Sequence, residues 1–403
     1  MKDEMKSLAT PQMADLFSAD AVAKASNDFG CRLLRQIGAG QSSNVILSPV
    51  SLWLLLAMAR NGAGGATRTA MAKTLGIATM PDEEIGIRST ALLKVLNVAR
   101  GHAELEIANA VWLDSAVAIN PDFSRLSQEI YRAEVRRLNF SHDPNGAIEV
   151  INQWVNHKTR GHIQKIVSSL DPATVHVLTN AVYFEGKWAW PFDQRDTALN
   201  PFHLGKYRSV TVPLMRQTRS FSYLETEQFQ AVRLPYKGEQ LEMCVFLPQK
   251  REQEGSSPGT LAELTDVTDK STIKKWLNDP ASKRRPGTLL FPRFELNYER
   301  TINAELHQLG MGAAFDRGSA DFTLITSASP PLYLDAVFHK TFMKVDEEGT
   351  EAAGFSGVVL GAAFPLRAEQ PFQMIVDRPF LCLIRECATG ALLFIATIVN
   401  PCS

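Results

Sequence analysis

The sequence predicts an α+β protein with large β-sheets that are covered on both sides. Helical hydrophobic spacing dominates the first half of the chain, and β-branched or aromatic runs dominate the second half. Several of those later runs are apolar on both faces, which requires cover on both sides of their sheet. We therefore expect helices and sheets packed around one continuous core.

Three segments have the spacing of helices. Residues 21–40 carry apolar side chains at helical intervals and end in glycines. Residues 143–161 place Ile151 and Val155 on one apolar stripe, which predicts an amphipathic helix covering a flat surface. Residues 301–310 form one more short helical segment.

A further helix is predicted from its start and stop signals. A short apolar strand over residues 45–47 runs into Ser48, which suits an N-cap, and Pro49, which suits the first helical position. The helix is apolar on every side over residues 52–59, so we expect it to be buried. The Asn-Gly pair at 61–62 ends it.

Seven later runs are predicted strands because they are rich in β-branched and aromatic residues. They are residues 175–188, 229–236, 241–248, 287–296, 332–345, 379–387 and 391–399. The last two flank Ala388-Thr389-Gly390, so we expect them to form a hairpin.

Composition is that of an ordinary globular protein, with 403 residues, a formal net charge of −1 and 45% hydrophobic residues. Length alone favours two or three domains. The charge balance predicts neither a nucleic-acid partner nor a membrane surface. The longest basic cluster, Lys283-Arg284-Arg285, is interpreted as a solvated loop.

Five scattered cysteines are too few for a disulfide framework and are expected to be buried free thiols. The N-terminus lacks the apolar core of a signal peptide. This fits a cytoplasmic protein, but also a secreted one whose signal is missing from this chain.

Common enzyme motifs are absent from the sequence or incomplete. The zinc-protease pattern H-E-x-x-H is absent, and the eight histidines show no ligand spacing. The glycine-rich residues 62–67 are one glycine short of a dinucleotide fingerprint and follow a helix, so a helix stop is the better interpretation. Val358 replaces the last glycine of a nucleophile elbow at residues 354–358. We expect no enzyme, no metal and no cofactor.

Four segments together resemble the serpin family, in that family's order and spacing: NVILSPVS (44–51), LTNAVYFEGKWAWPF (178–192), FHKTFMKVDEEGTEAAG (338–354) and VDRPFLCLI (376–384). The resemblance covers about residues 25–400. It implies a single domain over 1–403, with an N-terminal extension over about 1–22 and a reactive-centre loop over 348–371. It also implies a serpin fold with three sheets and eight or nine helices.

The resemblance further implies a metastable monomer that inhibits serine proteases. In that mechanism the protease attacks the loop, forms an acyl-enzyme, and is trapped when the cut loop inserts into the main sheet. Insertion of the serpin loop is a known case of strand addition to a β-sheet. The family favours an extracellular location, although the missing signal leaves the cytoplasm open.

The segment that begins at residue 350, within the third motif, has the physical properties that strand insertion requires. The even-numbered residues 350–362 are uncharged and mostly small, and the odd-numbered set holds Glu351 as its one charge. Residues 350–363 would span about 46 Å at ~3.3 Å each. The hinge matches the inhibitory pattern at residues Glu347, Gly349, Thr350, Ala352, Ala353 and Gly354.

The resemblance also implies a position for the reactive bond. In inhibitory serpins this bond lies about seventeen residues after the hinge glutamate, here Glu347, and counting sixteen residues beyond Glu347 gives Ala363–Phe364. Alanine there suits an elastase-like or subtilisin-like protease. Leu366 or Arg367 would instead serve a chymotrypsin-like or trypsin-like enzyme, a few residues further on.

Two supporting sites follow from the resemblance, each matched residue by residue. A polar "shutter" beneath the opening sheet would contain Ser48, Ser51, Asn180 and His339. A "breach" where the loop first enters would contain Trp188, Arg293 and Glu347, with an Arg293–Glu347 ion pair.

A heparin site is not expected, since residues 81–101 mix Arg88, Lys94 and Arg100 with acidic residues. The rival hypothesis is a non-inhibitory serpin, a carrier or chaperone whose loop is only a substrate. The hinge composition favours inhibition.

Overall fold

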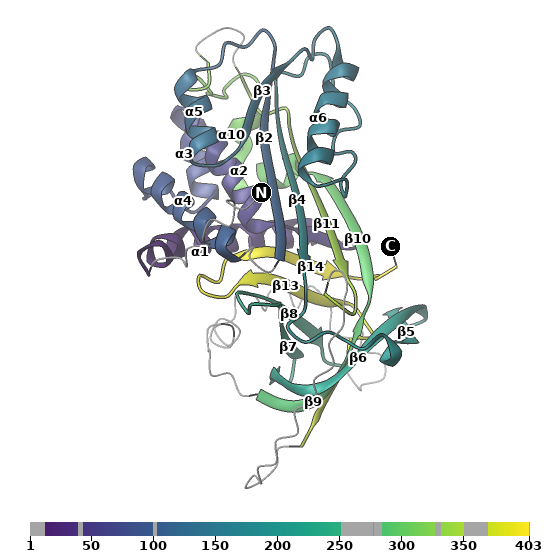
Figure 1. Ribbon diagram of the computed structural model, residues 1–403. Helices are drawn as coiled ribbons and strands as arrows, with labels where there is room; N and C mark the ends of the chain where they lie inside the picture. Colours follow the sequence, from purple (N-terminus) through teal and green to yellow (C-terminus); the bar gives the residue numbers. More distant parts are fainter. Residues whose placement is uncertain are drawn as a thin grey trace, which may run out of the picture.

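The computed structural model describes residues 13–38, 43–99, 103–250, 277, 284–326, 332–349 and 370–402. Two β-sheets and a group of helices make up these residues, with one further helix on the opposite side of the smaller sheet (Figure 1). The predicted α+β class is confirmed.

The helices lie mainly in the first half of the chain, as predicted. Within the described residues the α-helices are α1 (Met13–Gly38), α2 (Pro49–Asn61), α3 (Gly65–Thr74), α4 (Asp82–Ala99), α5 (Pro121–Glu129), α6 (Pro144–Lys158), α9 (Asn303–Leu306) and α10 (Gly312–Phe315). Two short irregular turns are η2 (Gln194–Asp196) and η4 (His307–Met311). No described helix combines the length and apolarity needed to cross a bilayer.

The strands supply both sheets. They are β1 (Val45–Leu47), β2 (Ala103–Asp114), β3 (Glu134–Leu138), β4 (His176–Gly186), β5 (Ala198–Gly205), β6 (Arg208–Glu225), β7 (Phe229–Pro235), β8 (Leu241–Pro248), β9 (Arg284–Pro292), β10 (Phe294–Thr301), β11 (Ala336–Val345), β12 (Phe372–Ile375), β13 (Phe380–Glu386) and β14 (Leu392–Ile398).

The smaller sheet has five strands in the order β10-β11-β4-β2-β3. Its central strands β4 and β11 run parallel, in a register from Val177 opposite Ala336 to Phe184 opposite Met343. β10 with β11 and β2 with β4 are antiparallel pairs. The sheet therefore contains a parallel pair at its centre, between strands far apart in sequence.

The larger sheet has the order β1-β14-β13-β8-β7-β6-β9-β12, with β5 also paired to β6. The family resemblance implied three sheets in all, whereas the described residues form two. The long strand β6 pairs with β9 over residues 214–222 and with β7 over residues 222–225. Backbone hydrogen bonds therefore continue through β6, which joins the strands from β1 to β7 and the strands β9 and β12 into one sheet.

Strands β2 and β4 bury side chains on both faces of the five-stranded sheet, since their successive residues point to opposite sides. Val111 and Leu113 belong to the main core, whereas Trp112 lies in a second apolar cluster against α6. There Trp112 meets Trp154 of α6 edge to face, with ring centroids 5.3 Å apart. The predicted amphipathic helix thus covers a flat sheet face (Figure 1).

Local signals placed several elements correctly. Strand β1 has the predicted bounds, α2 begins at Pro49 with Ser48 at its N-cap, and the β13–β14 hairpin is present. Helix α2 is buried on all sides down to Arg60. Its Trp53 Nε1 donates to the Leu75 carbonyl at 2.9 Å, which satisfies the indole inside the core.

Two interpretations of the sequence were wrong. The run 287–296 is not one strand, because Arg293 separates β9 from β10, which belong to different sheets. The basic cluster is not a solvated loop, because Arg284 and Arg285 begin strand β9. Lys283 lies outside the described residues.

None of the five cysteines forms a disulfide bond within the described residues, as expected. Cys31, Cys244 and Cys382 are buried, but Cys387 is half-buried and Cys402 is exposed. No group of histidine, cysteine and acidic residues suited to a metal ion occurs in the part of the chain that the structure describes.

Candidate functional site

A row of polar side chains crosses the centre of the five-stranded sheet. Asn180 of β4 lies opposite Asn109 of β2 on one side and opposite His339 of β11 on the other. Asn180 Nδ2 donates to Asn109 Oδ1 at 2.6 Å, and the His339 Nδ1–Asn180 Oδ1 distance is 2.7 Å. All three side chains are buried, so this row joins three strands inside the core.

Helix α2 completes the cluster through Ser51. Asn180 Nδ2 donates to Ser51 Oγ, and Asn109 Nδ2 reaches the Ser51 carbonyl at 3.4 Å. We call Ser51, Asn109, Asn180 and His339 the polar row. Since both amide hydrogens of Asn180 are engaged, its Oδ1 is the acceptor and His339 Nδ1 the donor.

The polar row contains three of the four residues expected in the shutter, and one that sequence reasoning missed. Ser48 is buried beside them, but its hydroxyl has no hydrogen-bond partner among the described residues and makes no cap bond. Asn109 was missed. Its signal was a lone asparagine within the apolar residues 107–113.

Burial determines the charge state of His339. Removal from water lowers its pKa to about 3, and the Ile46 carbonyl opposes this shift only in part. The imidazole is therefore neutral near pH 7 and forms an uncharged hydrogen bond with Asn180. The neighbouring Thr341 Oγ1 donates to the Ile46 carbonyl at 3.1 Å, which links β11 to β1.

At the end of β11 the chain is held by the segment that follows β4. Trp188 Nε1 donates to the Asp346 carbonyl at 2.9 Å, and the Trp188 backbone N–H donates to the Glu348 carbonyl at 3.0 Å. The Phe192 N–H donates to the Glu347 carbonyl at 2.7 Å. We call this contact, between residues 188–192 and 346–349, the clasp.

Glu347 places a carboxylate inside the clasp. The residue is 3% exposed, and its Oε1 accepts from Thr197 Oγ1 at 2.8 Å. Arg293 Nη1 lies 3.6 Å from the same oxygen, although the Arg293 side chain is 52% exposed. The expected breach residues Trp188, Arg293 and Glu347 thus lie together, and Thr197 is a partner that sequence reasoning missed.

Gly349 ends the clasp in a conformation that suits glycine alone. Its φ is +105°, and a Cβ there would lie 2.3 Å from the Gly186 carbonyl oxygen and 2.4 Å from the Trp188 nitrogen. Reciprocal backbone hydrogen bonds of 3.3 Å close the turn between Asp346 and Gly349. The chain therefore leaves the sheet directly beside the end of β4.

The remaining predicted loop residues lie outside the described residues. These are the hinge positions Thr350, Ala352, Ala353 and Gly354, and the candidate bonds at Ala363, Phe364, Leu366 and Arg367. The described chain resumes at Gln370 and enters β12, which pairs in parallel with β9.

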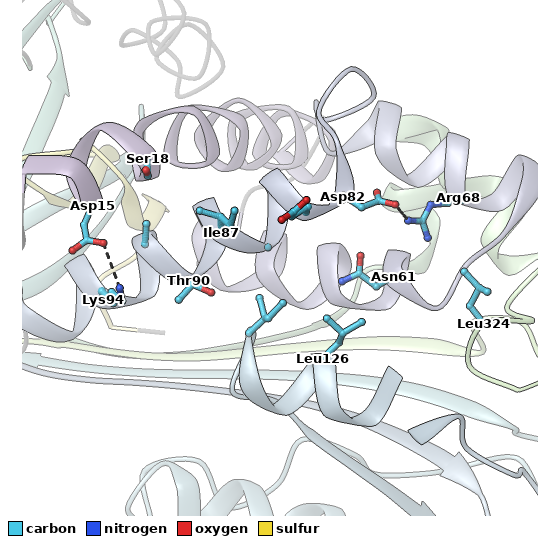
Figure 2. A pocket seen from close by; sticks show the side chains of 14 residues that line it. Asp15, Ser18, Asn61, Arg68, Asp82, Ile87, Thr90, Lys94, Leu126 and Leu324 are labelled. Atoms are coloured by element: carbon cyan, nitrogen blue, oxygen red, sulfur yellow. Dashed lines mark hydrogen bonds and ion pairs between the residues drawn. The ribbon is translucent and has the colours of Figure 1, made fainter. Parts of the chain in front are cut away.

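A separate cavity of about 580 Å³ lies between α1, α4 and α5 (Figure 2). Most of its charged side chains are paired: Lys94 with Asp15 at 3.5 Å, and Asp82 with both Arg60 and Arg68, whereas the exposed Glu83 forms no ion pair among the described residues. On α4, Arg88 is likewise paired with Glu84 at 2.7 Å. Mixed and internally paired charges of this kind do not form a basic face.

Comparison with protein families places almost the whole chain in one group. The model described as Serpin (serine protease inhibitor) matches residues 24–401. The chain is 30% identical over 364 residues to leukocyte elastase inhibitor of Homo sapiens, covering 89% of this chain and 94% of that protein. It is 32% identical over 380 residues to an uncharacterized serpin-like protein of Thermococcus kodakarensis, covering 94% and 86%.

Solved structures agree with this grouping. Mouse protein-Z dependent protease inhibitor superposes with a TM-score of 0.84 at 27% identity, covering 96% of this chain and 99% of that one. Thyroxine-binding globulin in complex with thyroxine superposes with a TM-score of 0.83 at 27% identity, covering 95% and 100%. The similar structures thus include both a protease inhibitor and a ligand-binding protein.

Proposed function

The chain belongs to the serpin family of serine protease inhibitors, and on that premise we propose that it is a suicide-substrate inhibitor of serine endopeptidases. The protease serine attacks the carbonyl carbon of the bait residue in the loop after β11. The peptide bond breaks, the new amine takes a proton, and an acyl-enzyme forms. The cut loop then inserts between β4 and β11 before water can release the protease.

The observation that carries this proposal is the parallel pairing of β4 with β11. The loop begins just after β11, at the clasp, so a strand formed from it must run back antiparallel to both neighbours. Insertion would replace a central parallel pair by two antiparallel pairs, which are slightly more stable per residue. With about 1 kcal/mol net for each new hydrogen bond, the total could match a typical folding stability of about 10 kcal/mol.

The composition of the loop supports the same mechanism. Its even-numbered face over residues 350–362 is small and uncharged, so it can enter the core between the parted strands. We infer cleavage at Ala363–Phe364 by an elastase-like or subtilisin-like protease, because alanine fits a small primary pocket. The relative named leukocyte elastase inhibitor is in keeping with such a target.

A non-inhibitory role, as a carrier or chaperone, is the second candidate. It is favoured by the structural likeness to thyroxine-binding globulin, which is seen in complex with thyroxine. The fold alone therefore does not separate inhibitor from carrier. The hinge composition favours inhibition.

Incubation with elastase-like, subtilisin-like, chymotrypsin-like and trypsin-like proteases tests the proposal. We expect a denaturant-resistant complex with one of the first two, and a C-terminal peptide that begins at Phe364 once the sample is denatured. Cleavage also should raise the melting temperature sharply. Cleavage without a complex and without a rise in melting temperature would favour the carrier.

Thr350→Arg provides the matched variant, because it places an unpaired charge on the face that would be buried. We expect this protein to be cut at the same rate as the wild type but to release active protease. Undiminished trapping by Thr350→Arg would refute insertion of this face.

A further inference from the structure

A smaller cavity, of about 180 Å³, lies where β6, β7 and β9 meet the segment after β4. Three arginines from three strands line it: Arg219 of β6, Arg233 of β7 and Arg284 of β9. Trp190, which belongs to the clasp segment 188–192, lies among them. Arg284 comes from the basic cluster that the sequence had suggested was a solvated loop.

Two of these arginines share one indole ring. Arg219 Cζ lies 4.4 Å from the ring centroid of Trp190 and 4.1 Å from that of Phe221, and Arg284 Cζ lies 5.7 Å from the Trp190 centroid. Stacking engages the flat face of a guanidinium and leaves its N–H edge for an acceptor. The arginines therefore offer donor edges beside a rigid aromatic wall.

No carboxylate within the described chain forms an ion pair with either of these two arginines. Arg219 donates hydrogen bonds to neutral acceptors, Gln217 Oε1 at 2.7 Å and the Ser220 carbonyl at 3.0 Å. Within the described residues Arg284 makes no side-chain hydrogen bond, so neither guanidinium has a carboxylate partner there.

The acidic residues that line the cavity, Glu239 and Glu242, form no ion pair with Arg219 or Arg284. Glu242 is already bonded to Arg385, with Nε 2.7 Å from Oε1. Glu239 is exposed, and its charge acts on Arg219 without forming an ion pair. Burial, reinforced by repulsion from Arg284, lowers the pKa of Arg219 to about 10. An anion placed between the two arginines would relieve that repulsion.

We propose that this cavity binds a small inorganic oxyanion, phosphate or sulfate, between Arg219 and Arg284 and alongside Trp190. Guanidinium groups match the oxygen spacing of phosphate and sulfate and bind them through paired hydrogen bonds. The volume exceeds the ~30 Å³ share of a single water and is below the roughly 300–1,000 Å³ of pockets for drug-sized ligands. The larger cavity of Figure 2 lacks this feature, because both of its basic side chains, Lys94 and Arg68, are paired with carboxylates.

Calorimetric titration of the intact protein with inorganic phosphate and with sulfate tests the site, with chloride at equal ionic strength as the reference. We expect saturable binding of one phosphate or sulfate per chain and none of chloride. Phosphate should also change the tryptophan fluorescence, and Trp190→Phe should abolish most of that change while the protein still binds phosphate.

Substitutions then place the ion. Arg219→Gln and Arg284→Gln should each weaken binding at least tenfold, and Arg219→Lys should weaken it less, because it keeps the charge but loses the planar donor edge. Arg216→Gln is the matched control, since Arg216 is an exposed arginine of the same strand that does not line the cavity. It should bind phosphate as the wild type does.

Three results would overturn the proposal: absence of saturable binding, equal binding of chloride, or unchanged affinity in both glutamine variants. Arg284 is exposed, so Arg284→Gln is expected to fold and decides the matter if Arg219→Gln does not. Circular dichroism checks the fold of every variant before titration.

Discussion

The polar row and the clasp hold the same two strands in different ways. The row lies in the core and joins β2, β4 and β11 through neutral side-chain hydrogen bonds. The clasp lies at the end of β11 and uses backbone hydrogen bonds, one glycine turn and one buried carboxylate. Both would have to change if a strand entered between β4 and β11.

This difference suggests that the row and the clasp contribute differently to stability and to opening of the sheet. Loss of any member of the row leaves buried polar atoms without partners, so the row should resist separation of the strands strongly. The clasp depends on Arg293, which is half exposed, and on a turn that only glycine tolerates. We expect the row to dominate stability and the clasp to open first.

Asn180→Ala should have the largest effect, because it removes the hydrogen bonds to Ser51, Asn109 and His339 at once. We expect the free energy of unfolding to fall by about 3–5 kcal/mol, measured by urea titration. Asn145→Ala, at an exposed position in α6, is the control and should cause no loss. A decrease of less than about 1 kcal/mol in the free energy of unfolding of Asn180→Ala would show that the row does not dominate stability.

Gly349→Ala tests the turn of the clasp. The positive φ and the overlap with backbone atoms of the segment after β4 should cost about 2–3 kcal/mol. Thermal unfolding of this variant should be compared with Gly205→Ala, where nothing lies within 4 Å of an added Cβ. Equal melting temperatures for the two variants would show that the turn can relax.

Acid should weaken the row through His339, which is buried in the folded protein. Burial lowers the pKa of His339 to about 3, so between pH 6.5 and 3 the unfolded chain binds a proton that the folded chain does not. Stability therefore falls as the pH falls through this window. At pH 5 the loss from His339 should reach about 2 kcal/mol.

His176 must be separated from this effect, because burial lowers its pKa to about 3 as well. Neither ring nitrogen of His176 has a hydrogen-bond partner among the described residues, so His176→Phe provides a background with one acid-sensitive histidine fewer. In that background, His339→Gln should remove the loss of about 2 kcal/mol that His339 causes between pH 7 and pH 5, while carboxylates with lowered pKa, such as Asp377, keep their own contribution. An unchanged loss in the His339→Gln variant would show that the row does not titrate as described.

The ion pair of the clasp should show the smallest effect, and an asymmetric one. Arg293→Gln leaves the Glu347 carboxylate buried with Thr197 alone, so we expect a loss of about 1–2 kcal/mol. Glu347→Gln leaves no buried charge and should cost less. Arg195→Gln removes an exposed pair with Asp193 and should change nothing measurable in urea titration. Equal losses for Arg293→Gln and Glu347→Gln would contradict this account of the clasp.

Local sequence signals predicted elements whose ends are marked by specific residues. Pro49 after Ser48 located the start of α2, and Gly390 marked the hairpin between β13 and β14. The same signals did not predict β2, because its glutamates and asparagine interrupt the apolar run. They also joined β9 to β10, because a chain that changes sheet at one residue leaves no break in hydrophobicity.

Only some residues of the candidate site could likewise be predicted from the sequence. Family motifs named Asn180, His339 and Glu347, but Asn109 and Thr197 are partners only because segments distant in sequence lie side by side. The same holds for Arg219 and Arg284, which meet on Trp190 through the pairing of β6 with β9. Contacts made by register between remote strands have no local signature.

Strands β13 and β14 lie deep in the nine-stranded sheet, held between β8 and β1 and buried along their whole length. A cut in the loop would divide the polypeptide without detaching its last segment, because hydrogen bonds to neighbours on both sides would keep that segment in place. A nicked molecule should therefore migrate as one particle on a native gel and as two fragments in detergent.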